Sequence, residues 1–113
     1  MHELSLAQSI IDIVKGNIPP KQIPDVKTVL VKVGDMSGVV SDSLLFCYDA
    51  IKTSSGLGQS SMRIEKIPFL VHCNDCNENS TNDFGLRACS FCSSFNTEII
   101  SGTEMSVSEV ELN

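Results

Sequence analysis

The first third of the chain changes from a helical to a strand-like pattern of hydrophobic residues. From Leu4 to Ile18 the hydrophobic positions follow the 3.6-residue period of an amphipathic helix, with Gln8 and Asp12 on the polar side. Pro19-Pro20 ends that pattern. Residues 26–33 are mainly β-branched, which predicts a strand.

A second helix and a second strand are predicted after the glycine-containing loop 34–38. Ser41 or Asp42 is a suitable N-cap for the helix. We expect its buried side to carry Leu44, Leu45, Tyr48 and Ile51. The next strand spans about residues 61–67, and a strand–helix–strand order predicts a parallel pair joined by a right-handed crossover.

The closing stretch, residues 104–112, alternates in hydrophobicity but slips by one position near Ser108-Glu109, which predicts a β-bulge. We expect it to return to the N-terminal sheet as a third strand. The predicted fold class is therefore α+β, with two helices on a small three-stranded mixed sheet and an inserted zinc-ribbon module. The predicted domains are residues 1–67 plus 103–113 and residues 68–102.

Two Cys-x2-Cys pairs, with twelve residues between them, predict a metal site. Zn²⁺ favours four thiolates in a tetrahedral arrangement, so we expect it to be bound by Cys73, Cys76, Cys89 and Cys92. Such a closed site has a structural role. Disulfides, an iron–sulfur centre and a redox dithiol are the alternatives, and disulfides would leave one of the five cysteines unpaired.

Charge is distributed unevenly along the chain. Residues 1–67 carry seven acidic and seven basic residues, whereas residues 68–113 carry seven acidic residues and only Arg87 as a base. Because nucleic-acid binding needs clustered lysines and arginines, nucleic acid is a poor partner. No hydrophobic run is long enough to span a bilayer, and the N-terminus lacks a basic region typical of a signal peptide, so we expect a cytoplasmic protein without membrane attachment.

The terminus Met1-His2-Glu3 contains a second candidate metal site. The α-amine of Met1, the backbone nitrogen and imidazole of His2, and the backbone nitrogen of Glu3 can form a square-planar set, which suits Ni(II) or Cu(II). The ordinary alternative is a frayed terminus with no metal, although a helix starting at Leu4 would hold these residues in place. For His72 and Cys47 we expect structural roles, an exposed strand residue and a small hydrophobic residue of the second helix.

Several motifs resemble those of the HypA/HybF family of hydrogenase nickel-incorporation proteins. The opening Met1–Ser9, the loop Val33–Val39, the two cysteine pairs and the closing residues from Gly102 to Glu111 all match the family pattern in order. Three features differ. Asn77 replaces the family glycine after the second cysteine, and Ser90 and Ser93 replace the proline and glycine of the second pair. The family's acidic loop position falls near Val40; Asp42 is close to it but is not assigned as a ligand.

The resemblance implies a nickel metallochaperone rather than an enzyme. It implies nickel bound through His2 and nearby backbone nitrogens with Glu3 part of the motif, and structural zinc. The sequence itself is compatible with a monomer or a homodimer. The implied partners are a nickel-handling GTPase and the large subunit of [NiFe]-hydrogenase, or urease in some organisms. The alternatives from other classes are a zinc-ribbon module that binds protein or nucleic acid without nickel transfer, and a dithiol oxidoreductase.

Overall fold

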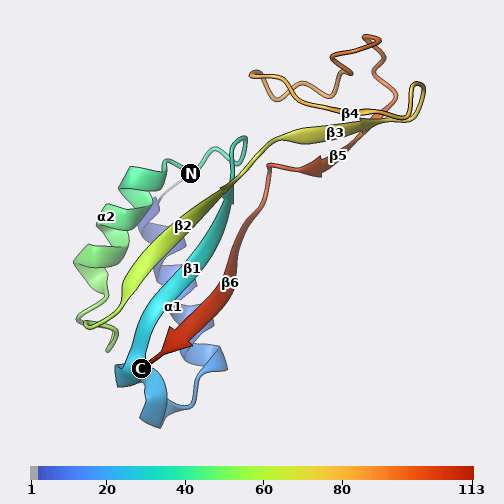
Figure 1. Cartoon of the computed structure of the whole chain (residues 1–113). Helices are drawn as coiled ribbons and strands as arrows, with labels where there is room; N and C mark the ends of the chain where they lie inside the picture. The colour runs from blue at the N-terminus through green and yellow to red at the C-terminus, as the bar shows by residue number, and fades with distance from the viewer. Residues whose placement is uncertain (1–2) are drawn as a thin grey trace. The chain divides into compact units, whose positions relative to one another are not determined.

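The structure is a computed structural model that describes residues 3–113. It contains the helices α1 (Glu3–Asn17) and α2 (Ser41–Ile51) and a short 3-10 helix η1 (Pro20–Asp25). The strands are β1 (Val26–Gly34), β2 (Ser61–Ile67), β3 (Leu70–Cys73), β4 (Asn79–Ser80), β5 (Thr97–Ser101) and β6 (Met105–Leu112) (Figure 1). The helices and strands predicted from hydrophobic patterning are present, whereas η1 and β4 were not predicted.

The chain forms two compact units. The first contains the residues up to Lys32, together with Val39–Glu65 and Ser106–Asn113. The second contains Val33–Gly38 and Lys66–Met105. The loop after β1, which we expected in the first domain, therefore groups with the second unit, while the division into functional domains remains a prediction.

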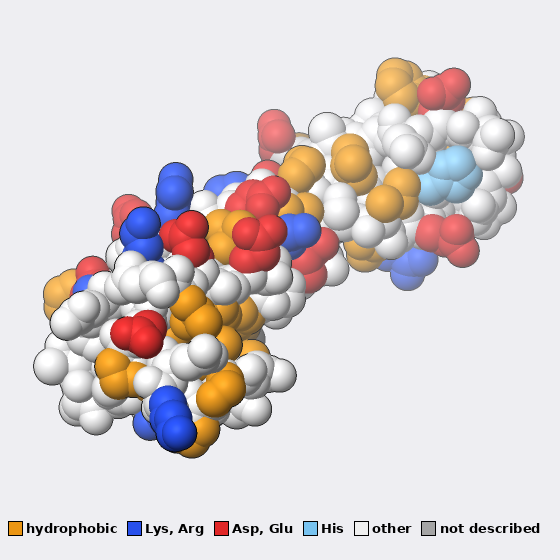
Figure 2. Space-filling model, turned by 60° about the horizontal axis from the view of Figure 1, so that its bottom comes forward, with side chains coloured by type: hydrophobic (Ala, Val, Ile, Leu, Met, Phe, Trp, Pro, Cys, Tyr) orange, Lys and Arg blue, Asp and Glu red, His pale blue; other side chains and the backbone are white. Residues whose placement is uncertain are grey.

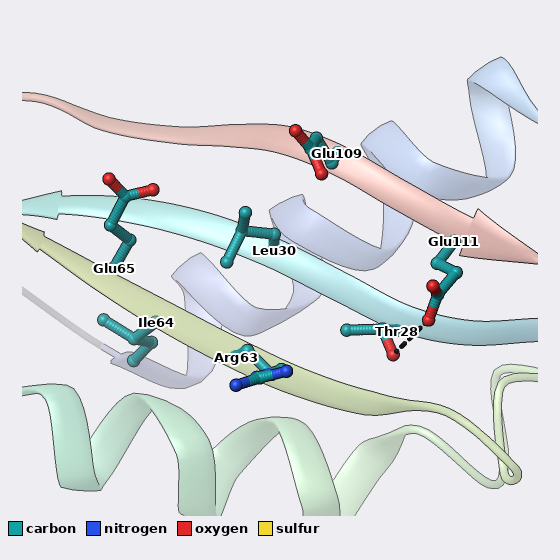
Figure 3. A pocket seen from close by; sticks show the side chains of 7 residues that line it. All are labelled: Thr28, Leu30, Arg63, Ile64, Glu65, Glu109 and Glu111. Atoms are coloured by element: carbon teal, nitrogen blue, oxygen red, sulfur yellow. Dashed lines mark hydrogen bonds between the residues drawn. The ribbon is translucent and has the colours of Figure 1, made fainter.

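The larger sheet has the strand order β2-β1-β6. β1 and β2 run in the same direction and β6 runs in the opposite direction (Figures 1 and 3). α2 connects the two parallel strands, so the predicted crossover and the predicted return of the C-terminal strand are both confirmed. The burial pattern of β6 changes phase at Ser108-Glu109, where two consecutive residues are exposed, as the sequence pattern indicated.

The core of the first unit combines one side of each helix with the strands. Its fully buried residues include Ala7, Ile10, Ile11 and Val14 from α1, Leu44 and Tyr48 from α2, and Val26, Val29 and Val31 from β1. Leu45 and Ile51, expected in the core, are only half-buried. The Tyr48 hydroxyl is 2.6 Å from the Ser60 Oγ atom, and burial raises the pKa of Tyr48.

The predicted cap of α2 is wrong. The helix begins at Ser41, so Ser41 and Asp42 lie inside it and Val40 is the N-cap residue. Val40 makes no side-chain capping hydrogen bond, because valine has no polar side-chain atom. The backbone N–H of Val40 instead donates to the Glu3 carboxylate at the start of α1, with 3.3 Å between nitrogen and Oε2. The first turns of the two helices are thus linked.

The second unit contains an antiparallel sheet with the order β4-β3-β5. Val71 pairs with Ser80 on one side and with Ile99 on the other. Its buried hydrophobic side chains are those of Val33, Phe69, Val71, Cys73 and Cys89, and its buried polar ones are those of Ser80 and Thr97. Pairing with β3 buries Ser80, although it lies in a polar stretch between the two cysteine pairs.

Candidate metal centre

The four cysteines of the two Cys-x2-Cys pairs converge. Their Sγ atoms all lie within 4.8 Å of one another. Cys73 and Cys92 are separated by 3.6 Å between Sγ atoms, and so are Cys76 and Cys89. A zinc ion with Zn–S bonds of about 2.3 Å would place its sulfur ligands about 3.8 Å apart, so this cluster fits a structural zinc ion.

The same distances exclude disulfide bonds. A disulfide requires an S–S separation of about 2.05 Å, and all five cysteines are free. The chain reaches the cluster from the end of β3, which supplies Cys73, and from the loop between β4 and β5, which supplies Cys89 and Cys92. The prediction that the sequence spacing would bring all four together is confirmed.

Backbone N–H groups surround one sulfur of each pair. Cys73 Sγ accepts a hydrogen bond from the Cys76 N–H at 3.5 Å, and Cys89 Sγ accepts from the Phe91 N–H at 3.3 Å and the Cys92 N–H at 3.5 Å. These donors stabilise the thiolate and lower the pKa of Cys89 to about 6, with the Cys92 N–H the largest cause. Backbone donors therefore favour the charge state that metal binding requires.

Cys76 shows the opposite shift. The Glu78 backbone lowers its pKa, but burial and the neighbouring sulfur atoms outweigh that contact and raise the pKa of Cys76 to about 12. Ionising the Cys76 thiol beside three other thiolates is unfavourable when no cation is present. A bound dication removes this repulsion and makes four thiolates compatible.

The residue after each pair adopts a left-handed backbone conformation. Asn77 has φ 63° and Ser93 has φ 64°. Their N–H groups donate to the carbonyl oxygens of Cys73 and Cys89 at 2.9 and 3.0 Å, so the two turns are equivalent. Asn77 and Ser93 therefore occupy positions that favour glycine, and they are the two positions at which the family resemblance implies glycine.

Side chains other than those of the cysteines connect the zinc turns to neighbouring segments, and the sequence marked only Ser90 among them. The Ser90 N–H donates to Ser80 Oγ at 3.1 Å, and Ser90 Oγ donates to the Thr81 carbonyl oxygen at 2.6 Å. Asp75 accepts hydrogen bonds from Ser94 Oγ and from the Asn96 amide. The sequence signal was the concentration of serine, asparagine and aspartate beside the cysteines.

Neither His72 nor Cys47 belongs to the cluster. His72 Nδ1 lies 2.7 Å from Asn79 Oδ1, on the adjacent strand. Cys47 is half-buried on α2 and lines a pocket of about 450 Å³ together with Glu3, Leu4, Asp42, Ser43 and Phe46. Within residues 3–113, the four cysteines are the one group of three or more potential metal ligands that converge.

The second predicted metal site falls at the edge of what the structure describes. Met1 and His2 lie outside the described residues. Glu3 is the first residue of α1, so the helix begins one residue earlier than the expected Leu4 and includes the last residue of this motif. The Glu3 carboxylate accepts a hydrogen bond from the Val40 N–H, which links the first turn of α1 to α2.

A hollow on the sheet of the first unit does not form a metal site. It has a volume of about 430 Å³ and is lined by Thr28, Leu30, Arg63, Ile64, Glu65, Glu109 and Glu111. Figure 3 shows its three carboxylates pointing from separate positions on β2 and β6 rather than toward one point. Thr28 Oγ1 donates to Glu111 at 3.2 Å, so one of them already has a protein partner.

Comparison with known proteins places this architecture in a family. Residues 1–112 match the family model described as "HypA: Hydrogenase/urease nickel incorporation, metallochaperone, hypA". The chain is 33% identical to hydrogenase maturation factor HypA of Geotalea uraniireducens, with 99% of each chain covered. It is 34% identical to the protein of that name from Desulfatibacillum aliphaticivorans, covering 99% of this chain and 87% of the relative.

Two solved structures have the same fold. One, described as the solution structure of HypA protein, has a TM-score of 0.72 at 23% identity and covers 100% of this chain and 97% of that one. The other is the Ni metallochaperone HypA from Helicobacter pylori, with a TM-score of 0.68, 23% identity and coverage of 99% and 97%. None of the helices within residues 3–113 is long and hydrophobic enough to cross a membrane. The match over nearly the full length, together with the four-cysteine cluster, shows that this chain belongs to the HypA family of nickel metallochaperones that act in hydrogenase maturation.

Proposed function

We propose that this chain carries Ni(II) at its N-terminus and holds Zn(II) through Cys73, Cys76, Cys89 and Cys92. Nickel is bound by the His2 imidazole and by the nitrogens of Met1, His2 and Glu3. Zinc is a structural ion and nickel is the cargo. The observation that carries this function is the family match, which begins at residue 1 and therefore includes the terminal motif.

The first turn of α1 supports a defined terminal site. Glu3 begins the helix, and its carboxylate accepts a hydrogen bond from the Val40 N–H. A nitrogen-based square-planar site loses much less conformational entropy on metal binding when one of its ligands is already part of a helix. Metal binding then needs to order only Met1 and His2, which carry the three remaining nitrogen ligands.

Metal analysis of the untagged protein tests the terminal site. We expect about one nickel and one zinc per chain, loss of nickel but not of zinc in His2→Ala, and the same loss when one glycine precedes Met1. His72→Ala is the matched control because His72 is the only other histidine, and it should keep both metals. Nickel bound by His2→Ala as tightly as by the parent would refute the site. Zinc without nickel in the parent would favour the alternative zinc-ribbon interaction module.

The zinc ligands are tested by cysteine replacement. Cys76→Ser should lose zinc, because three thiolates do not complete the closed tetrahedral site. Cys47→Ser is the matched control and should retain one zinc, since Cys47 lies on α2 and outside the cluster. Thiol-specific labelling of the zinc-loaded protein should modify Cys47 only. Rapid labelling of Cys73 or Cys89 in the loaded protein would instead favour the dithiol oxidoreductase.

Release of nickel should respond to acid. Each proton that returns to the imidazole or to an amide nitrogen removes a nickel ligand, so nickel affinity should fall as pH drops through about 6.5, the ordinary range of histidine. Isothermal titration at pH 6 and pH 8 measures this. Equal affinity at both values would contradict binding through His2.

The chain is a carrier and not an enzyme, and we place its work in the cytoplasm. It delivers nickel to the large subunit of [NiFe]-hydrogenase together with a nickel-handling GTPase, and urease is a second recipient. Transfer from the nickel-loaded chain to the purified apo large subunit tests this role. Transfer should depend on His2 and increase with the GTPase and GTP.

A further inference from the structure

The loops between β4 and β5 expose several large hydrophobic side chains. Phe84 is 80% exposed, Phe91 70%, Phe95 78% and Leu86 53%. We call these four residues the zinc-loop surface. None of the four is among the buried hydrophobic residues of the second unit, which include Phe69 and Val71. Exposed phenylalanines concentrated in one segment of about a dozen residues are characteristic of a site of protein association.

The loop that presents Phe84 and Leu86 is held by one side chain. Asn82 Oδ1 accepts hydrogen bonds from the Phe84 N–H at 3.0 Å and the Leu86 N–H at 2.9 Å, and Asn82 Nδ2 donates to the Leu86 carbonyl oxygen at 2.8 Å. Three hydrogen bonds within five residues fix the backbone that carries the two exposed side chains. A preorganised loop loses less entropy when it binds.

Phe91 is fixed by the metal site itself. It lies between Cys89 and Cys92, and its N–H donates to Cys89 Sγ at 3.3 Å. The preceding residue, Ser90, is bonded to Ser80 Oγ and to the Thr81 carbonyl oxygen, which joins this turn to the strand that leads into the Asn82 loop. The segments that carry Phe84, Leu86 and Phe91 are therefore connected by hydrogen bonds.

The charge around these side chains is strongly negative. Residues 70–101 contain Asp75, Glu78, Asp83 and Glu98, with Arg87 as the single base. The Arg87 guanidinium donates to the Thr97 carbonyl oxygen at 2.9 Å. Four thiolates on one zinc ion add two more negative charges. Figure 2 shows hydrophobic side chains exposed beside acidic ones on the surface of this unit.

We propose that the zinc-loop surface docks a protein surface that is hydrophobic at its centre and lined with lysine or arginine at its rim. Charge complementarity selects this occupant. A second copy of the chain would present the same negative charge, and an anionic membrane would be repelled in the same way. This proposal is independent of the nickel site and goes beyond the carrier function.

The test uses two synthetic amphipathic helical peptides and the full-length, zinc-loaded protein. Both peptides carry the same face of leucine and tryptophan, flanked by lysine in one and by glutamate in the other. Titration followed by 15N NMR should show shifts at Phe84, Leu86 and Phe91 with the lysine peptide. Its affinity should exceed that of the glutamate peptide at least tenfold and should fall as salt is raised. Equal binding of the two peptides would overturn the proposal.

The matched variants are Phe84→Ser/Leu86→Ser/Phe91→Ser and Phe46→Ser. Phe46 is 74% exposed on α2, so its replacement removes a comparable side chain elsewhere. The triple variant should keep its zinc and nickel and lose at least tenfold in affinity for the lysine peptide, whereas Phe46→Ser should bind normally. If the triple variant loses zinc, Phe84→Ser alone replaces it and should weaken binding at least threefold. The proposal would be overturned if the zinc-loaded variant bound the lysine peptide as tightly as the parent. It would also be overturned if the parent sedimented as a dimer and the variant as a monomer, or if phosphatidylserine vesicles captured the parent.

Discussion

The Glu3 carboxylate accepts a hydrogen bond from the backbone N–H of Val40, with 3.3 Å between Oε2 and nitrogen. This contact joins the beginning of α1 to the N-cap residue of α2, which has no capping side chain of its own. An acidic side chain also interacts favourably with the positive ends of both helices. Glu3 thus combines a structural role with a backbone nitrogen that we propose as a nickel ligand.

Replacing Glu3 with alanine should therefore affect both stability and nickel. Loss of a capping interaction typically costs about 1 kcal/mol, so the melting temperature of the protein should fall by several degrees. Nickel affinity should weaken without being abolished, because the backbone nitrogen remains, and zinc content should not change. Glu3→Gln keeps a carbonyl acceptor and should show a smaller loss of stability. A melting temperature equal to that of the parent in Glu3→Ala would show that the contact contributes nothing.

The left-handed residues of the zinc turns allow a stabilising substitution. Ser93 has φ 64°, and glycine at that position would relieve an unfavourable conformation worth up to about 1 kcal/mol. Ser93→Gly should therefore slow zinc loss to a chelator. Asn77→Gly should have a smaller effect, since asparagine tolerates this conformation well. Ser90→Gly serves as the contrasting variant: it removes the hydrogen bond to Thr81 and should accelerate zinc loss. Faster loss from Ser93→Gly than from the parent would contradict the argument.

Gly102 should not tolerate a side chain. Its φ is 103°, and a Cβ atom would come within 2.9 Å of Phe69 Cβ and closer still to the Phe69 backbone. Gly102→Ala should therefore cost more than about 2 kcal/mol, measured by chemical denaturation. Gly16→Ala is the matched control, because a Cβ atom at Gly16 in α1 meets nothing within 4 Å. It should stabilise the protein by about 0.5–1 kcal/mol. Similar stability of the two alanine variants would exclude this explanation.

Asp75 links the first zinc turn to the segment after the second. Hydrogen bonds from Ser94 Oγ and then from the Asn96 amide lower the pKa of Asp75 below its usual value of 3.8. Because the pKa in the folded protein is the lower one, the stabilisation is fully present above about pH 3.8 and is lost as pH falls through the folded value. Asp75→Ala should release zinc several times faster than the parent, by the same factor at pH 6.5 and at pH 8. Asp83→Ala removes another exposed acidic side chain of the same unit and should release zinc at the parental rate.

Removal of zinc should unfold the second unit selectively. Its buried hydrophobic side chains are few, and two of them, Cys73 and Cys89, belong to the metal cluster. Such a small core requires its ion. With a chelator, the NMR signals of β3, β4 and β5 should collapse to unfolded positions, while those of α1 and α2 stay dispersed. Collapse of all signals together would show that the first unit also depends on zinc.

By themselves, hydrophobic periodicity predicted the two α-helices and the three strands of the larger sheet, and cysteine spacing predicted the metal cluster. Residues such as Ile10, Ile11 and Leu44 recur at the helical period, and the two Cys-x2-Cys pairs limit how far apart their sulfurs can lie. Patterns of this kind are local, so they can be recognised without a fold. The cap of α2 and the burial of Ser80 could not be predicted in this way, because each depends on a partner distant in the sequence: Glu3 for Val40, and β3 together with Ser90 for Ser80.

Tertiary structure alone decided how the zinc turns are held and what they expose. The hydrogen bonds of Asp75 with Ser94 and Asn96 span about twenty positions, and nothing in the local sequence selects those pairs. The exposure of Phe84 and Phe91 is also a tertiary result. A phenylalanine in a sequence is expected to be buried. Only the tertiary structure shows that this small metal-centred unit has too small a hydrophobic core to bury these side chains.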